Sequence, residues 1–251
     1  MSVYSIYFSP TNSTKGIVNL VAGEIGNFEE LDLSKNEELN KVFNSDDICV
    51  IGVPSYGGRV PDIALKRMKG LKGNNTKTML VVSYGNRAYE DTLKELADNL
   101  SKQDFSCVGA IAAIAEHSIM HQFATGRPDE KDKMELKTFA NKILEKIKME
   151  NVSNELQLPG NYPYREYKGV PLKPKATKEC SGCGVCAKSC PVGAISIDNP
   201  KKTDKNLCIS CMRCIEICPT HSRKVNSFML KVASKKMTAA CQDRKENELF
   251  I

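Results

Sequence analysis

Two cysteine runs within forty residues constrain this chain more than any other feature of its sequence. Both runs share the spacing C-x2-C-x2-C-x3-C-P. The first contains Cys180, Cys183, Cys186 and Cys190, and the second contains Cys208, Cys211, Cys214 and Cys218. Two zinc sites are one explanation, but a tetrahedral zinc site usually takes its four ligands as separated pairs. Zinc therefore leaves the repeated spacing unexplained.

The spacing of each run is that of bacterial iron–sulfur proteins. In such proteins the fourth cysteine of a run binds the other cluster when two clusters are present. A disulfide framework is disfavoured because nothing in the sequence indicates secretion. We therefore expect two [4Fe–4S] clusters.

Size and composition are those of a globular chain with one large domain or two modest ones, since it has 251 residues and is 41% hydrophobic. Residues 1–10 lack the basic and apolar regions of a signal peptide. No apolar run approaches the roughly 20 residues of a membrane span. We expect a cytoplasmic protein, because that compartment suits oxygen-sensitive clusters.

The net charge of +6 is unevenly distributed along the chain. Residues 151–251 hold 17 Lys and Arg against 9 Asp and Glu, so the excess lies on the segment with the cysteines. Each cluster with its four thiolates carries about −2 overall, which offsets much of this surplus. The remaining positive surface could attract an acidic redox partner. Nucleic acid is not an expected partner, because the basic residues are not interleaved with aromatic ones.

The first 150 residues alternate between strand and helix patterns, which predicts a parallel sheet with helices on both faces. The expected strands are 3–8, 28–33, 48–53, 77–82 and 106–115, and the expected helices are 15–26, 62–69, 90–102 and 129–150. Five strands in this length fit the doubly wound, flavodoxin-like order 2-1-3-4-5. Ligands of such sheets lie beyond the carboxyl ends of the strands, so we expect the site in the loops after residues 8, 53, 82 and 115.

The remaining chain divides by composition. Four prolines make 151–178 a linker, and its three tyrosines, Tyr162, Tyr164 and Tyr167, predict that it lies against one or both domains. We expect domains at 1–150 and 179–226, with a short strand at Ala194–Ile197 in the second. Residues 227–251 are expected to form a helix and a tail, whose apolar end either docks or frays.

Hydroxyl residues fill the loop that joins the first strand to the first helix. They are Ser9, Thr11, Ser13 and Thr14, together with Asn12. Free backbone N–H groups and the helix dipole make such a junction suitable for phosphate. The loop matches neither a Walker A sequence nor a dinucleotide fingerprint. The alternative is that Ser13 or Thr14 only caps the helix.

This loop resembles the flavodoxin FMN-phosphate signature S/T-x-T-G-x-T, with Asn12 in place of the glycine. Asn tolerates left-handed backbone better than most residues, so the loop shape could persist. Two further loops resemble flavin-binding segments. They contain Pro54, Ser55, Tyr56, Gly57 and Gly58 after the third strand, and Tyr84, Gly85, Asn86, Arg87 and Tyr89 after the fourth. The resemblance implies FMN, with one of these tyrosines stacked on its ring.

The whole chain resembles the flavodoxin–ferredoxin fusion family. The likeness extends to residues 116–118, 126–129 and the ending 247–250. It implies two cluster ligand sets. One set is Cys180, Cys183, Cys186 and Cys218, and the other is Cys208, Cys211, Cys214 and Cys190.

Other residues near these motifs have two interpretations. His117 or Arg127 either tunes the flavin or only stabilises its own loop, through Glu116–His or Arg127–Asp129 contacts. We expect the second role for both. Cys49 and Cys107 fall in strands and are expected to be buried small hydrophobes, whereas Cys241 has no partner at ligand spacing. His221 is expected at the surface.

These features predict an electron carrier that relays electrons between two [4Fe–4S] clusters and FMN. Its expected partners are ferredoxin- or flavodoxin-dependent oxidoreductases. An FMN-dependent reductase of a small substrate, fed by its own ferredoxin domain, is the alternative. A redox-sensing adaptor is a third interpretation. The sequence does not indicate which cluster lies nearer the flavin.

Overall fold

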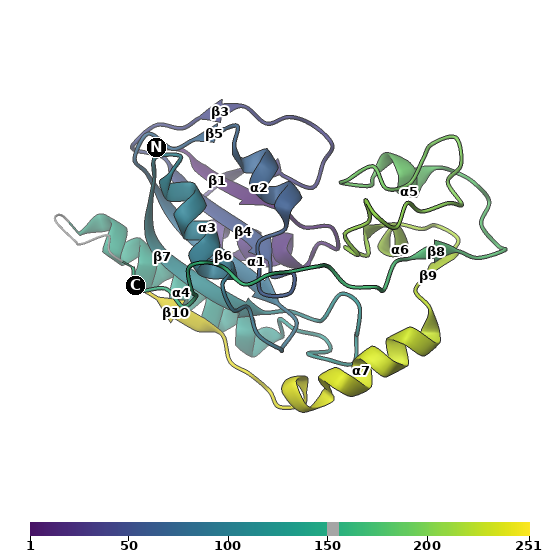
Figure 1. Cartoon of the computed structure of the whole chain (residues 1–251). Coiled ribbons are helices and arrows are strands. Elements are labelled where there is room, and N and C mark those ends of the chain that lie inside the picture. Colours follow the sequence, from purple (N-terminus) through teal and green to yellow (C-terminus); the bar gives the residue numbers. More distant parts are fainter. Residues whose placement is uncertain (150–155) are drawn as a thin grey trace.

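The computed structural model describes residues 1–149 and 156–251 (Figure 1). The predicted helix end at Glu150 and the start of the linker lie outside the described residues. Five strands run parallel in one sheet: β1 (Val3–Tyr7), β2 (Phe28–Asp32), β4 (Ile48–Pro54), β6 (Thr76–Tyr84) and β7 (Phe105–Ile114). Their order, β2-β1-β4-β6-β7, confirms the predicted flavodoxin-like arrangement. Two short strands, β3 (Lys41–Val42) and β5 (Leu71–Lys72), pair separately.

Helices cover both faces of this sheet, because its strands β1, β4, β6 and β7 are buried on both sides. In β4, for example, Ile51 packs into one core cluster and Val50 into the other. The helices α1 (Ser13–Gly23) and α4 (Glu130–Lys148) cover one face, and α2 (Asp62–Met68) and α3 (Thr92–Ser101) cover the other. Asp129 caps α4 in a capping box with Asp132.

A sixth strand, β10 (Glu248–Phe250), pairs antiparallel with β7 and closes that edge of the sheet. Leu249 packs against the core of one face and Phe250 against the core of the other. The end of the chain therefore docks, which decides between the two outcomes left open by the sequence. In Figure 1 the yellow C-terminal segment lies beside α4 and β7.

The cysteine region contains two short helices, α5 (Val185–Lys188) and α6 (Arg213–Glu216), each within one run. A two-stranded ladder, β8 (Lys175–Ala176) with β9 (Arg223–Lys224), joins the residues that flank the runs. The strand predicted at Ala194–Ile197 is wrong. The N–H of Ala194 bonds the Cys190 sulfur at 3.3 Å and its carbonyl accepts from Asp204, so these groups are not available to a ladder.

Two segments connect this region to the sheet. The linker lies against α3, as its aromatic content predicted: the Tyr164 hydroxyl donates to Asp98 at 2.6 Å, and the Arg165 N–H donates to Asp91 at 2.7 Å. On the other side, α7 (Ser227–Cys241) is capped by Asn226 and leads back to β10 (Figure 1). No helix in the described part of the chain is long and apolar enough to cross a membrane.

Candidate functional site

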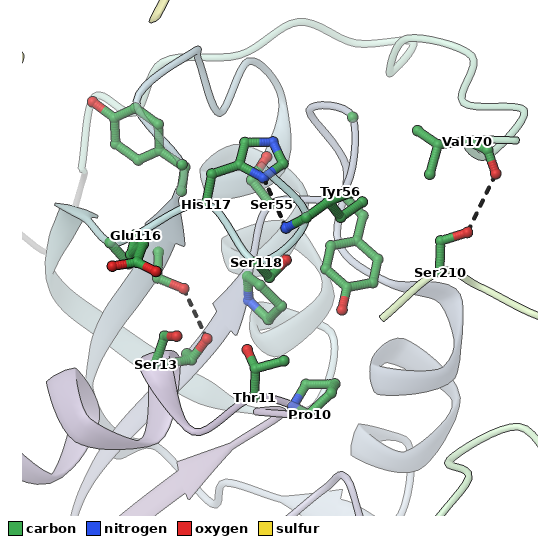
Figure 2. A pocket seen from close by; sticks show the side chains of 18 of the residues that line it. Pro10, Thr11, Ser13, Ser55, Tyr56, Glu116, His117, Ser118, Val170 and Ser210 are labelled. Atoms are coloured by element: carbon green, nitrogen blue, oxygen red, sulfur yellow. Dashed lines mark hydrogen bonds between the residues drawn. The ribbon is translucent and has the colours of Figure 1, made fainter. Parts of the chain in front are cut away.

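A cavity of about 130 Å³ lies beyond the carboxyl ends of β1, β4, β6 and β7 (Figure 2). This is the edge of the sheet at which the sequence predicted a ligand site. The lining residues come from the three predicted flavin loops, the loop after β7, the linker and the second cysteine run. They are Pro10, Thr11, Ser13, Thr14, Pro54, Ser55, Tyr56, Gly57, Ser83, Tyr84, Gly85, Ala115, Glu116, His117, Ser118, Ile119, Tyr167, Val170, Ile209 and Ser210.

Some residues of the loop after β1 determine its conformation, and others line the cavity. Asn12 adopts left-handed backbone with φ 64° at the start of α1, as the comparison with glycine anticipated. Its side chain makes no capping bond, and the Ser9 hydroxyl instead accepts from the Lys15 N–H at 2.9 Å. Ser9 and Asn12 therefore shape the loop without lining the cavity. Among the described residues, no acceptor is assigned to the N–H groups of Ser13 and Thr14.

The loop after β4 brings an aromatic side chain and a close backbone approach to the cavity. Tyr56 and Arg59 exchange two backbone hydrogen bonds, which makes a tight turn. Gly57, at the turn, has φ +61°, and a Cβ there would lie 2.3 Å from the Tyr167 ring. Gly58 faces Glu90 instead of the cavity. Only glycine allows the linker ring to pack this closely on the loop.

The loop after β6 contributes less to the cavity than the sequence predicted. Tyr84 and Gly85 line it, but Asn86, Arg87 and Tyr89 do not. The Asn86 amide donates to the carbonyls of Cys241 and Asp243, at 2.8 and 2.7 Å. Arg87 pairs with Glu90, and the Tyr89 hydroxyl donates to Glu248 at 3.0 Å. Asn86 and Tyr89 thus hold the C-terminal segment that forms β10.

His117 lies in the cavity wall after β7, where it packs on Gly85 (Figure 2). Burial lowers the pKa of His117 to about 4. Its Nδ1 accepts from the N–H groups of Ile119 and Met120, at 3.1 and 3.3 Å, so the neutral ring carries its proton on Nε2. The neutral ring of His117 therefore has its hydrogen-bond donor at Nε2.

The rest of that loop is held by hydrogen bonds and an ion pair, in agreement with the expected role of these residues in stabilising their own loop. Glu116 bonds His121 at 2.6 Å and accepts from the Gly126 N–H at 2.7 Å. Arg127 is buried and pairs with Asp132, where the sequence suggested Asp129. Its other donor reaches the carbonyl of Lys245, so Arg127 also anchors the segment before β10.

A second, smaller pocket is lined by four cysteines, one of them from the first run. They are Cys190, Cys208, Cys211 and Cys214. Burial raises the pKa of Cys211 to about 12, and the charges of Cys214, Cys190 and Cys208 add to the rise. Four sulfurs that affect one another in this way lie close together. We call them the inner set.

The remaining four cysteines of the runs, Cys180, Cys183, Cys186 and Cys218, are named the outer set. Cys183 is exposed, whereas Cys186 and Cys218 are buried. Although burial raises the pKa of Cys218, hydrogen bonds from the Ser222 N–H and from Thr220 bring it below its ordinary value. The Ser222 bond, at 3.3 Å, repeats the Ala194 bond to Cys190.

The alternatives to clusters find no support in this arrangement. All eleven cysteines are free, so the runs form no disulfide framework. Among the described residues, no three His, Cys, Asp or Glu side chains are close enough for a single metal ion.

The cavity and the inner set share a wall. Ile209 and Ser210, which lie between Cys208 and Cys211, line the cavity, and Ile209 also lines the cysteine pocket. Burial raises the pKa of Tyr56 well above its usual value, and the charges of Cys211, Tyr167 and Cys208 add to the rise. Tyr56 therefore lies between the cavity and the inner set.

Four cavity residues come from the linker and the second cysteine run, which the sequence did not place at the site: Tyr167, Val170, Ile209 and Ser210. The aromatic linker gave a partial signal for Tyr167. Ser210 donates to the Val170 carbonyl at 3.3 Å, which joins the linker to the second run (Figure 2). No pattern in the sequence reports how the two regions pack together.

Comparison with known proteins matches residues 179–222 to the family of 4Fe-4S dicluster domains. Ferredoxin-2 of Chlorobaculum tepidum is 36% identical over 52 residues, which cover 18% of this chain and 84% of that protein. YccM of Escherichia coli (strain K12) is 36% identical over 83 residues, which cover 31% of this chain. The chain spans only 23% of the length of YccM.

Solved structures with similarity to part of the chain include flavodoxins. An archaeal flavodoxin has 15% sequence identity and a TM-score of 0.42, and the match covers 59% of this chain and 100% of that one. A Streptococcus flavodoxin has 15% identity and a TM-score of 0.43, with 58% and 99% covered. The sheet order described above is itself that of a flavodoxin-like domain. The chain therefore belongs to the 4Fe-4S dicluster ferredoxins through residues 179–222 and is a fusion of that domain with a flavodoxin-like α/β domain.

Proposed function

We propose that this chain binds FMN in the cavity and one [4Fe–4S] cluster in each cysteine set, and that it relays electrons between them. One observation carries the proposal. Ile209 and Ser210 belong to the second cysteine run and are also part of the cavity wall. A cofactor in the cavity and a cluster in the inner set would be neighbours across these two residues.

The residues of the cavity fit FMN. The N–H groups of Ser13 and Thr14 at the start of α1, with the Thr11 hydroxyl, suit a phosphate. Tyr56 offers an aromatic face, and Tyr84 and Gly85 line the cavity from the end of β6. Bound FMN would supply one- and two-electron chemistry, and the clusters one-electron chemistry. The chain would position these groups and limit the access of water between them.

The two cysteine sets suit different ends of the relay. Cys183 of the outer set is exposed, so this set is accessible to a partner. The inner set lies against the cavity and has buried Cys190 and Cys211. We therefore place the inner cluster nearer the flavin and the outer cluster nearer the partner protein. Lysines near the cysteine region, such as Lys175 and Lys205, would favour a partner with an acidic surface.

The test is anaerobic reconstitution of the full chain with iron, sulfide and FMN, followed by a stepwise reductive titration. Absorbance would count bound flavin, and EPR would count clusters. The expected result is about one flavin and about eight iron atoms per chain, all reducible in one titration. Full cluster loading without any FMN uptake would overturn the relay and leave a ferredoxin.

A reductase of a small substrate is a second candidate, favoured by His117. Its Nε2–H is a neutral donor in the cavity wall and could orient a substrate over the flavin. Reductase activity would then depend on His117, whereas electron exchange between clusters and flavin would not. Equal rates of substrate reduction in His117→Gln and wild-type protein would remove this candidate.

A further inference from the structure

Arg223 is a buried cation without an acidic partner. Its side chain is 1% exposed. Within the described ranges, 1–149 and 156–251, no carboxylate lies within ion-pair distance of it, and its Nε has no hydrogen-bond partner. Its other nitrogens donate to the Pro200 carbonyl at 2.8 Å and to the Thr203 hydroxyl. A guanidinium does not lose its proton in proteins, so such a charge is costly unless an anion compensates it.

Cysteine sulfurs of both sets surround this cation. Arg223 Nη1 approaches the Cys186 sulfur of the outer set at 3.7 Å. It also makes a hydrogen bond to the thiol of Cys214 in the inner set. The guanidinium therefore stands between one ligand of each set.

The internal repeat shows what another residue does at this position. Four residues after the fourth cysteine, Ala194 and Ser222 make equivalent N–H bonds to sulfur, so the next residues, Ile195 and Arg223, also correspond. Ile195 is buried against Cys186 and Cys214. The space between the sets is thus filled by an apolar residue from one copy and a cation from the other.

We propose that Arg223 is the shared countercharge of the two clusters and raises the reduction potentials of both. The inference rests on the proposed clusters. Each reduced cluster gains a negative charge, and a buried cation beside one of its thiolates stabilises that form. Because Arg223 touches both sets, it acts on the clusters together and makes them similar acceptors. Arg223 acts on the reduction potentials through the thiolate ligands of the clusters and binds no substrate.

The test compares four full-length proteins: wild type, Arg223→Gln, Arg223→Lys and Lys224→Gln. The last is a matched control, because Lys224 is the neighbouring residue and is exposed. Iron content and EPR spectra establish cluster loading, and anaerobic redox titrations give the potential of each cluster. In Arg223→Gln both potentials should fall, with a loss of about tenfold in the ratio of reduced to oxidised cluster at a fixed solution potential. Lys224→Gln should match wild type.

Arg223→Lys separates charge from packing. If Arg223→Gln fails to load clusters, retention of both clusters in Arg223→Lys supports the charge role, and loss of clusters there as well assigns Arg223 to packing and overturns the inference. Unchanged potentials in a fully loaded Arg223→Gln protein, or a shift in only one cluster, would also overturn it. Absence of clusters from wild type would instead refute the proposed function itself, so the two failures differ.

Discussion

The two cysteine runs have the same spacing, but the two cysteine sets that they form have different surroundings. The inner set lies against the cavity through Ile209 and Ser210, whereas the outer set has an exposed ligand in Cys183. The repeated motif therefore supplies one cysteine set beside the cavity and one set with an exposed cysteine. In the proposed relay, the order of the centres follows from this packing and not from the cysteines themselves.

The two cysteine runs also differ in the residues that occupy their left-handed backbone positions. The first run places Gly182 and Gly184 at positive φ, with values of 76° for both. The second has Ser210 and Met212 at the corresponding positions, with φ of 56° and 62°. Side chains in left-handed backbone cost free energy. In the second run this cost is offset by two side chains that glycine would lack. Ser210 closes the cavity, and Met212 is buried beside the cysteine pocket.

Removal of one cysteine from each set would break the comparison most directly. We expect Cys183→Ala and Cys211→Ala each to reduce iron from about eight to about four atoms per chain. After rapid photochemical reduction of the remaining cluster, flavin absorbance should still bleach in Cys183→Ala but not in Cys211→Ala. The reverse pattern would place the outer set beside the flavin.

A methyl group at Gly57 would disturb the cavity and leave the outer cysteine set unchanged. Gly57→Ala forces a strained φ and a clash with Tyr167, at a cost of about 1–3 kcal/mol, so FMN affinity should fall about tenfold or more. Gly126→Ala is the matched control, because Gly126 has φ +74° but open space around its Cβ position. Fluorescence titration with FMN measures the effect. Equal losses in both variants would show that strain alone, and not the linker contact, is responsible.

Acid should lower the free energy of unfolding through His117. Its pKa is about 4 in the folded chain and near 6.5 when unfolded, so protons favour the unfolded state. Its contribution to stability is complete above pH 6.5 and is lost as the pH falls toward 4. Between pH 7 and 5, wild type should lose about 1–2 kcal/mol more unfolding free energy than His117→Gln, as measured in urea. Parallel pH profiles would contradict this.

The smallest expected effect exchanges the backbone residues of the two runs. Gly182→Ser puts a side chain at positive φ without a partner and should cost about 1 kcal/mol. Ser210→Gly relieves strain but loses the bond to Val170, so its net effect should be within about 0.5 kcal/mol. Chemical denaturation of both variants measures the difference. Equal costs would mean that the second run stores no strain.

The strands and the site edge were predictable because their signals are local. Buried runs such as Ile48–Val53 and the loops that follow them identify a parallel sheet and its ligand edge. The cysteine spacing likewise lies within short segments. Asn12 was anticipated at left-handed backbone for the same reason, since one residue's own preference decides it.

Contacts between distant segments could not be read from such signals. Asn86 and Tyr89 were predicted to contact flavin, but their partners lie about 155 to 159 residues away in the C-terminal segment. A three-residue strand such as β10 has no periodicity to detect. Ala194 was predicted to lie in a strand, whereas its N–H bonds the sulfur of Cys190. The wall of Ile209 and Ser210 depends on how two regions pack.

The position of β10 has a consequence for the folding of the chain during its synthesis. A ribosome makes the apolar strand β7 long before it makes the residues that cover its open edge, and both cysteine runs emerge in between. An uncovered edge strand is a template for aggregation. A chain whose cysteine region stays disordered for lack of iron would hold α7 and β10 in place less well. If the proposed clusters order the cysteine region, iron supply would affect the solubility of the chain during synthesis.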